Sequence, residues 1–263
     1  MHAVYILSGL GVFSLLSEIL NLRKFVFPVV VAGLLASVGA TLAFEWNSGL
    51  GHYHNMLIFD NYALAFSAAI SIIALLWFFM SRDYLHAKTH ITDHFALVLF
   101  ALVGAVFMIS YNNMVMLFLG IEILSIALYI LACGNMKNLF LNEASFKYFL
   151  MGSFATGFLL FGMTLIYGVT GSFELNVISG LLLNNTGMLT PMLYAGVLLL
   201  LVGLAFKVSA APFHFWAPDV YEGSPTVVTA FMSTIVKIAA FAAFFRLFSI
   251  CFSTIAPQWV FVV

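Results

Sequence analysis

The sequence predicts an all-α membrane protein, a polytopic bundle of transmembrane helices with one helix broken near Lys207–Pro212. Of its 263 residues, 64% are hydrophobic and 7% are charged, whereas soluble domains average about 45–50% apolar and about 25% charged residues. Long apolar runs recur along the chain, without the short alternating segments typical of a β-barrel. The formal net charge of −1 excludes a basic nucleic-acid-binding surface, and the hydrophobicity excludes disorder.

Eight apolar runs are long enough, or nearly so, to cross a bilayer core about 30 Å thick, which needs roughly 20 apolar residues. They lie at residues 4–20, 25–44, 62–80, 95–111, 114–133, 148–168, 191–215 and 226–245. The first run lacks the positive start and small-residue cleavage site of a signal peptide, so we interpret it as a helix. No linker or shift in composition divides the runs, so residues 1–263 are expected to form a single membrane domain.

The joins between the runs predict how neighbouring helices are arranged. Runs one and two, and runs four and five at Asn112–Asn113, are separated by only a few residues, which makes them antiparallel neighbours. The longest loops are expected at 45–61, 81–94 and 169–190, and the segment Phe173–Ile178 in the last of these predicts a short helix at the membrane surface.

The sixth run carries a glycine at every fifth residue. With this spacing, Gly152, Gly157 and Gly162 do not all lie on one face of the helix. Small residues at these positions still allow close contact between helices.

Loop charges predict the orientation, because cytoplasmic loops carry an excess of Lys and Arg. The loops on one side hold Arg23, Lys24, Arg82, Lys88, Lys137 and Lys147. The loops on the other side hold Glu45, Asp60 and Glu174 and no basic residue. A loop at 217–224 with Asp219 and Glu222 is the exception on the basic side, but acids count little in this rule. The N-terminus is therefore expected outside. The tryptophans Trp46, Trp77, Trp216 and Trp259 fall near run ends, as an aromatic belt predicts.

Three charged residues fall inside the runs: Glu122, Lys207 and Lys237. A charge at the bilayer centre costs at least about 2.5–3.5 kcal/mol, so three unpaired charges would cost about as much as the whole net stability of a protein. They must pair, face water or lose their charge. Taken alone, Lys207 can be a lysine whose long side chain reaches the membrane interface. A structural Glu–Lys ion pair can explain two of the three charged residues. All three together favour a proton or ion relay.

Pro212 follows Lys207 by five residues and removes a backbone hydrogen bond inside a long apolar stretch. A simple proline kink and a broken helix both fit this pattern. The stretch is longer than one straight span requires, which favours the broken helix, and irregular backbone at membrane depth is tolerated where it lines a wet cavity or is buried in protein. Since burial favours a neutral lysine and a nearby carboxylate favours a charged one, Glu122 is expected to modulate Lys207 and Lys237 as proton carriers.

Other potential sites are weak. The cysteines Cys133 and Cys251 have neither metal nor disulfide spacing. Histidines recur at helical spacing between runs three and four, at His86, His90 and His94 beside Asp83 and Asp93. Such spacing can hold zinc on a helix, but Lys88 and Thr89 interrupt any closed site, so no metal is expected.

Two stretches resemble a known family. The segment 206–226, Phe-Lys-Val-Ser-Ala-Ala-Pro-Phe-His-Phe-Trp-Ala-Pro-Asp-Val-Tyr-Glu-Gly-Ser-Pro-Thr, is similar to the antiporter-like membrane subunits of respiratory complex I, the NADH-quinone oxidoreductase. Its ending is similar to the subunit N branch, and the segment 118–125, Phe-Leu-Gly-Ile-Glu-Ile-Leu-Ser, resembles the family's glutamate helix. The resemblance implies a proton path through Glu122, Lys207 and Lys237, with His214 and Pro212 in supporting positions.

The resemblance also implies the setting: a multi-pass subunit of the bacterial inner membrane, surrounded by lipid and by other membrane subunits, with no nucleic-acid partner. NADH, FMN, iron–sulfur clusters and quinone are expected on other subunits, and no cofactor on this chain. The family has about fourteen helices in two inverted five-helix repeats, so the second repeat is expected to be missing here and the sequence to be truncated after Val263. A subunit of a multi-subunit cation/proton antiporter or a membrane-bound hydrogenase, and a non-transporting scaffold with structural ion pairs, remain as alternatives.

Overall fold

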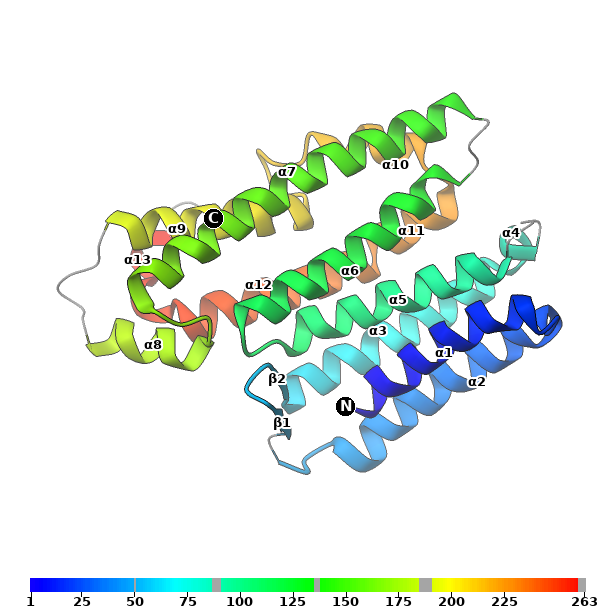
Figure 1. Cartoon of the computed structure of the whole chain (residues 1–263), viewed down its shortest axis with the longest axis horizontal. Helices are drawn as coiled ribbons and strands as arrows, with labels where there is room; N and C mark the ends of the chain where they lie inside the picture. Colours follow the sequence, from blue (N-terminus) through cyan, green and yellow to red (C-terminus); the bar gives the residue numbers. More distant parts are fainter. Residues whose placement is uncertain (50, 87–90, 135–137, 185–190, 260–263) are drawn as a thin grey trace.

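The long helices lie side by side as a bundle with roughly parallel axes (Figure 1). The computed structural model describes residues 1–49, 51–86, 91–134, 138–184 and 191–259. Within these residues, eight helices are long and apolar enough to cross a membrane, which confirms the predicted fold class. They are α1 (His2–Ile19), α2 with the π-helical turn η1 (Arg23–Ala40 and Thr41–Glu45), α3 (Asn61–Met80), α5 (Ile91–Ser110), α6 (Met114–Cys133), α7 (Leu139–Thr170), α9 (Pro191–Val208), and α11, α12 and the π-helical turn η2 as one span (Thr226–Ser233, Ile235–Arg246 and Leu247–Cys251).

Shorter elements join these helices at their ends. They are the hairpin of β1 and β2 (Gly51–Tyr53 and Leu57–Phe59), α4 (Arg82–His86), α8 (Leu175–Asn184), α10 (Trp216–Gly223), η3 (Ser253–Ile255) and α13 (Ala256–Trp259). Helix α8 confirms the short helix predicted after Phe173. The predicted loop at 217–224 is wrong, because this segment is α10. Pro218 falls in the first turn of α10, where its missing N–H costs nothing, and Asp219 complements the helix dipole there.

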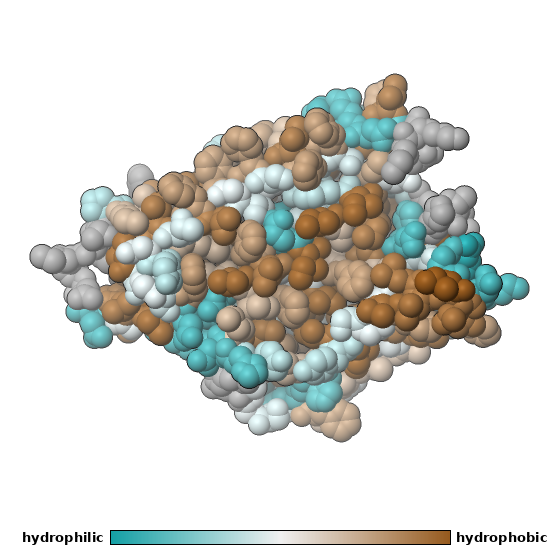
Figure 2. All heavy atoms as spheres, viewed as in Figure 1, coloured by the Kyte–Doolittle hydropathy of each residue, from teal (hydrophilic) through white to brown (hydrophobic). Residues whose placement is uncertain are grey.

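The two ends of the bundle differ in where the Lys and Arg residues of the loops lie. We call the end that carries Arg23, Lys24 and Arg82 the basic end. The other, which carries Glu45, Asp60 and Glu174, is the acidic end. Lys88 and Lys137 lie outside the described residues. Hydrophobic atoms cover most of the side of the bundle, and hydrophilic atoms gather mainly toward its ends (Figure 2), as a bilayer requires. This distribution of Lys and Arg agrees with the predicted orientation of the chain. Which end faces the cytoplasm stays a prediction.

Two of the four tryptophans do not belong to an interfacial belt. Trp77 and Trp216 are buried, and the Trp77 indole donates a hydrogen bond to the carbonyl of Val227 at 2.8 Å. Their rings pack against protein because α11 lies against α3 at Trp77 and α7 lies against α10 at Trp216. The belt interpretation was therefore wrong for these two.

Two of the three glycines that were predicted to allow close helix contact let α7 approach its neighbours. A side-chain carbon at Gly162 would come within 2.7 Å of the Gly196 carbonyl on α9. A side chain at Gly152 would collide with the Tyr129 hydroxyl on α6. Gly157 has open space around it, so its predicted packing role is wrong. The close α7–α9 contact fixes the helix that carries Lys207.

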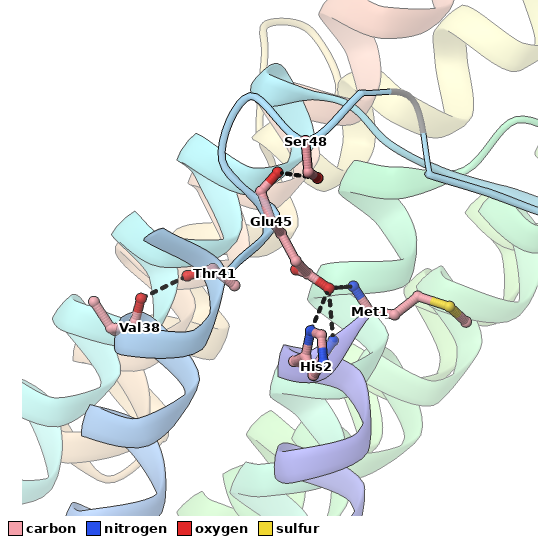
Figure 3. Close-up of polar contacts among 6 residues, drawn as sticks. All are labelled: Met1, His2, Val38, Thr41, Glu45 and Ser48. Carbon is pink, nitrogen blue, oxygen red and sulfur yellow. Dashed lines mark hydrogen bonds and ion pairs between the residues drawn. The ribbon is translucent and has the colours of Figure 1, made fainter. Parts of the chain in front are cut away.

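At the acidic end, the Glu45 carboxylate fastens the end of η1 to the start of α1 (Figure 3). One of its oxygens accepts hydrogen bonds from the Met1 amino group and, at 2.9 Å, from the His2 backbone N–H. The same oxygen lies 2.8 Å from Nδ1 of the His2 ring. The Thr41 hydroxyl donates to the carbonyl of Val38. These contacts join the first two helices away from the buried lysines described next.

Candidate functional site

Helix α9 ends directly after Lys207, at Val208, as the position of Pro212 predicts. Ser209 adopts a left-handed backbone conformation with φ of +60°. The N–H of Ala210 then bonds back to the carbonyl of Ala205 at 2.9 Å, which closes the helix in the way that left-handed caps usually do. The chain resumes as a helix only at Trp216. The span predicted at 191–215 is therefore helical only to Val208, and the last carbonyls of α9 are free to accept other donors.

Lys207 is buried between α9 and α6. Its side chain is 5% exposed, and its Nζ donates a hydrogen bond to the Ser125 hydroxyl at 2.6 Å. Ser125 in turn donates to the carbonyl of Ile121 at 2.5 Å. Such burial is expensive for an ammonium group unless a partner compensates it.

Glu122 lies one helical turn before Ser125 on α6 and is half-buried. It is close enough to act electrostatically on Lys207, but no ion pair joins the two among the described residues. The Lys207 ammonium thus contacts α6 one helical turn from Glu122 without a salt bridge, and the control of Lys207 by Glu122 stays a prediction. A charge on Glu122 favours the protonated form of Lys207, and its loss favours the neutral amine.

The last span is also broken, which sequence reasoning missed. Helix α11 ends at Ser233, and α12 begins at Ile235. Neither proline nor glycine marks the break. The hydroxyls of Ser233 and Thr234 both donate to the carbonyl of Ala230, at 3.2 and 2.6 Å. Because such back-bonding competes with the helix and bends it, the Ser-Thr pair ahead of Lys237 is the signal that could have predicted this break.

Lys237 sits in the first turn of α12 and reaches across to the end of α9. Its Nζ donates to the carbonyl of Lys207 at 3.0 Å and to the Ser209 hydroxyl at 2.5 Å. The ammonium therefore occupies the negative end of the α9 dipole, where a cation is stabilised. The two broken helices thus meet at their breaks, and Lys237 satisfies a carbonyl that the end of α9 leaves free.

Aromatic rings enclose this contact. Lys237 Nζ lies 5.0 Å from the centre of the Trp216 ring and 5.9 Å from that of Tyr221, within the range of cation–π attraction. Trp216 stacks on Tyr148 of α7 and Phe206 of α9 at about 5 Å. Burial raises the pKa of Tyr221, and an interaction with the Ser209 hydroxyl opposes the rise. Tyr221 therefore remains a neutral hydroxyl beside Ser209.

The structure thus brings the three predicted charges into one region and gives the two lysines different hydrogen-bond partners. Ser125, Lys207, Lys237 and Ser209 form a line of polar contacts, broken only by the main chain of Lys207. Each group in the line can donate and, when neutral, accept a proton. The two serines were missed by sequence reasoning because a lone serine in an apolar run carries no pattern.

The supporting residues take different positions. Pro212 and His214 are exposed on the segment between α9 and α10, and the backbone carbonyl of His214 accepts a hydrogen bond from Ala217 at 2.9 Å. The supporting role of the His214 side chain stays a prediction. Among the described residues no group of three or more His, Cys, Asp or Glu side chains gathers as metal ligands do; His90 lies outside them.

A model of the NADH:quinone oxidoreductase/Mrp antiporter transmembrane family matches residues 111–263. The chain belongs to this family. The match includes Glu122, Lys207 and Lys237, and it confirms the resemblance found in the sequence.

Individual members of the family are similar over nearly the whole chain. The NADH-quinone oxidoreductase subunit N of Cytophaga hutchinsonii is 45% identical over 256 residues, which are 97% of this chain and 55% of that protein. A chain of respiratory complex I from Thermus thermophilus superimposes with a TM-score of 0.79 at 32% identity, covering 93% of this chain and 52% of that one. A chain of the Mrp complex from Dietzia sp. has a TM-score of 0.80 at 20% identity, covering 95% and 49%, and shares the fold. The chain spans about half the length of the curated relatives it matches.

Proposed function

We propose that this family member carries protons across the membrane as part of a subunit N of NADH-quinone oxidoreductase, coupled to electron transfer from NADH to quinone. The observation that carries the proposal is the pair of lysines at two facing helix breaks, Lys207 buried and Lys237 half-buried. Neither lysine has a described carboxylate at ion-pair distance. A charge held by hydroxyls and a carbonyl can leave without stranding a buried opposite charge, as proton transfer requires.

In this mechanism Glu122 controls the first lysine. When Glu122 is ionised, Lys207 holds a proton beside Ser125. When the charge of Glu122 is neutralised or its partner changes, the buried ammonium is no longer compensated and gives its proton up. Lys237, at the negative end of α9, is the next site that favours a positive charge. Transfer along this line would need water or a side-chain movement past the Lys207 carbonyl.

The relatives support a proposal for the setting of the chain. We infer that the basic end faces the cytoplasm of a bacterial cell with the N-terminus outside, that other membrane subunits surround the chain, and that flavin, iron–sulfur clusters and the quinone site lie on those partners. An Mrp-type cation/proton antiporter subunit or a membrane-bound hydrogenase subunit is the second candidate. The 45% identity to a subunit N, against 20% to the Mrp chain, favours the first.

The test uses the complex assembled with the full subunit and placed in lipid vesicles. Lys207→Met and Glu122→Gln remove one charge each with little change in volume. Both are expected to lower the number of protons moved per NADH oxidised, by on the order of tenfold or more for Lys207→Met. Lys24→Met, which removes an exposed lysine at the basic end, is the control and should leave the ratio unchanged. An unchanged ratio in Lys207→Met would refute the relay.

The scaffold alternative has its own test. If Glu122 and Lys237 were a structural pair, exchanging the two residues would restore both assembly and pumping. We expect the exchanged variant to assemble and not to pump, because Lys237 contacts a helix terminus and a hydroxyl instead of Glu122.

A further inference from the structure

Tyr129 buries a hydroxyl that the lysine line does not use. The residue is 8% exposed, and its hydroxyl has no hydrogen-bond partner of normal geometry among the described residues. Buried tyrosine hydroxyls usually find a partner, in protein or in water. An unpaired hydroxyl at this depth therefore indicates a place where water, or a proton in transit, is the partner.

The position of Tyr129 extends the polar line toward the basic end. Glu122, Ser125 and Tyr129 follow the i, i+3, i+7 spacing that places residues on one face of a helix. The Ser125 hydroxyl is near enough to the Tyr129 hydroxyl for a hydrogen-bond interaction, and the charge of Glu122 acts on it from one turn further away. Ser125 is also the hydroxyl that receives the hydrogen bond of Lys207. The Tyr129 hydroxyl is therefore one step removed from the buried amine.

The neighbouring helix holds this hydroxyl in place. The rings of Tyr148 and Phe149 on α7 meet the Tyr129 ring edge-on, at 4.8 and 5.6 Å between ring centres. Gly152 on α7 leaves the space that the hydroxyl occupies, since any side chain there would collide with it. The position is thus built by packing and not left to a mobile side chain.

A cavity of about 760 Å³ leads from the Tyr129 side chain to the basic end, between the start of α5, the end of α6 and the start of α7. Polar side chains line it along with apolar ones: Asp93, His94, Cys133, Asn142 and Ser145. A water molecule takes up about 30 Å³ of liquid volume and needs polar partners, so the cavity has room and contacts for several. Asp93 and His94 belong to the histidine-containing segment 86–94 discussed above.

Two cavities border α9, and their side chains offer water fewer polar contacts. One measures about 590 Å³ and has Ser209 as its polar side chain, beside Lys237 instead of Lys207. The other measures about 450 Å³ and is lined almost entirely by apolar side chains, among them Phe154 and Phe206. Its charged residue, Lys147, is already paired with Glu143 and Asp219, each at 2.8 Å. Of these three cavities, the Tyr129 cavity offers water the most polar side chains, and we take it as the hydrated approach to Lys207.

We propose that the Tyr129 cavity is the inlet through which protons from the aqueous phase at the basic end reach Lys207, with the Tyr129 hydroxyl as the relay. A hydronium ion in the cavity gives a proton to the Tyr129 oxygen as the Tyr129 hydroxyl proton passes to the Ser125 oxygen. The Ser125 proton passes to the neutral Lys207 amine, which becomes an ammonium. Each hydroxyl gains one proton and loses one, and water remains in the cavity.

This inlet rests on the proposed function, and the test separates the two. Tyr129→Phe removes only the relay oxygen, and in the full complex in vesicles it should slow proton uptake by on the order of tenfold or more. Tyr167→Phe removes a tyrosine hydroxyl from the far end of α7, where the ring stacks on Phe173, and should leave uptake unchanged. If Lys207→Met stops pumping while Tyr129→Phe pumps normally, the inlet is wrong and the lysine relay stands.

Cys133 provides a second readout that does not depend on pumping. It lines the cavity and is half-buried, whereas Cys251 is fully buried. A charged, membrane-impermeant methanethiosulfonate reagent added on the basic-end side should label Cys133 and spare Cys251, as read by mass spectrometry of the intact complex after digestion. Labelling should also slow proton uptake, while Cys133→Ser is unaffected by the reagent. A Cys133 that the reagent cannot reach from this side would overturn the inlet.

Discussion

The chain buries positive charge in two regions, and their surroundings differ. Toward the acidic end, Arg246 is 2% exposed and forms an ion pair with Asp60 at 2.7 Å, with the Tyr62 ring 5.0 Å from its guanidinium. Nearer the basic end, Lys207 and Lys237 contact hydroxyls and a carbonyl instead. A buried cation with a fixed counter-charge is held permanently, because separating the pair leaves two uncompensated charges. A buried cation without one can change its protonation state.

The arginine region joins three parts of the bundle. Asp60 also caps α3 by accepting a hydrogen bond from the Ala63 N–H at 2.8 Å. The Tyr111 hydroxyl, from the join between α5 and α6, donates to the carbonyl of Ala243 at 2.9 Å. Burial raises the pKa of Tyr111 well above its usual value, so this hydroxyl stays neutral and keeps donating. Arg246 therefore ties the end of α12 to the start of α3, away from the helix breaks that meet at Lys237.

The largest effect on stability is expected from Asp60→Ala. The substitution leaves the Arg246 guanidinium buried without its counter-charge and removes the α3 cap, so the free energy of unfolding in detergent should fall by about 3–5 kcal/mol. The double variant Asp60→Ala with Arg246→Met removes both charges and should recover most of the loss. Equal losses in the single and double variants would show that the cap, and not the buried charge, accounts for the effect.

Sequence patterns predicted these two regions to different extents. The eight spans and the break after Lys207 were predictable, because hydrophobic runs and a proline act locally. The break at Thr234 has no proline, and the Arg246–Asp60 pair joins residues 186 positions apart, so neither has a local signature. Glu122 and the two lysines were predictable because charges are costly in lipid. Their partners were not, since one is a backbone carbonyl and the others are single serines.

An intermediate effect is expected at Ser209, where two contributions can be separated. Ser209→Ala removes the hydroxyl that Lys237 contacts and keeps a left-handed residue with a side chain, so the free energy of unfolding should fall by about 1.5–3 kcal/mol. Ser209→Gly removes the same hydroxyl but relieves the left-handed backbone, so its loss should be smaller by about 1 kcal/mol. Chemical unfolding in detergent measures both. Equal losses would mean that the φ of +60° carries no cost at this helix end.

The smallest effect on stability is expected from Lys207→Met, the variant that should stop pumping. Methionine fills a similar volume, and Ser125 keeps its hydrogen bond to the Ile121 carbonyl, so no buried polar group is left unpaired. Lys207 forms no ion pair that the substitution would break, and the free energy of unfolding should stay within about 1.5 kcal/mol of the parent or rise. Leu204→Met, at a buried site on the same helix, calibrates the methionine itself. A loss of the size expected for Asp60→Ala would place Lys207 with Arg246 among the structural cations, and the contrast between the two regions would fail.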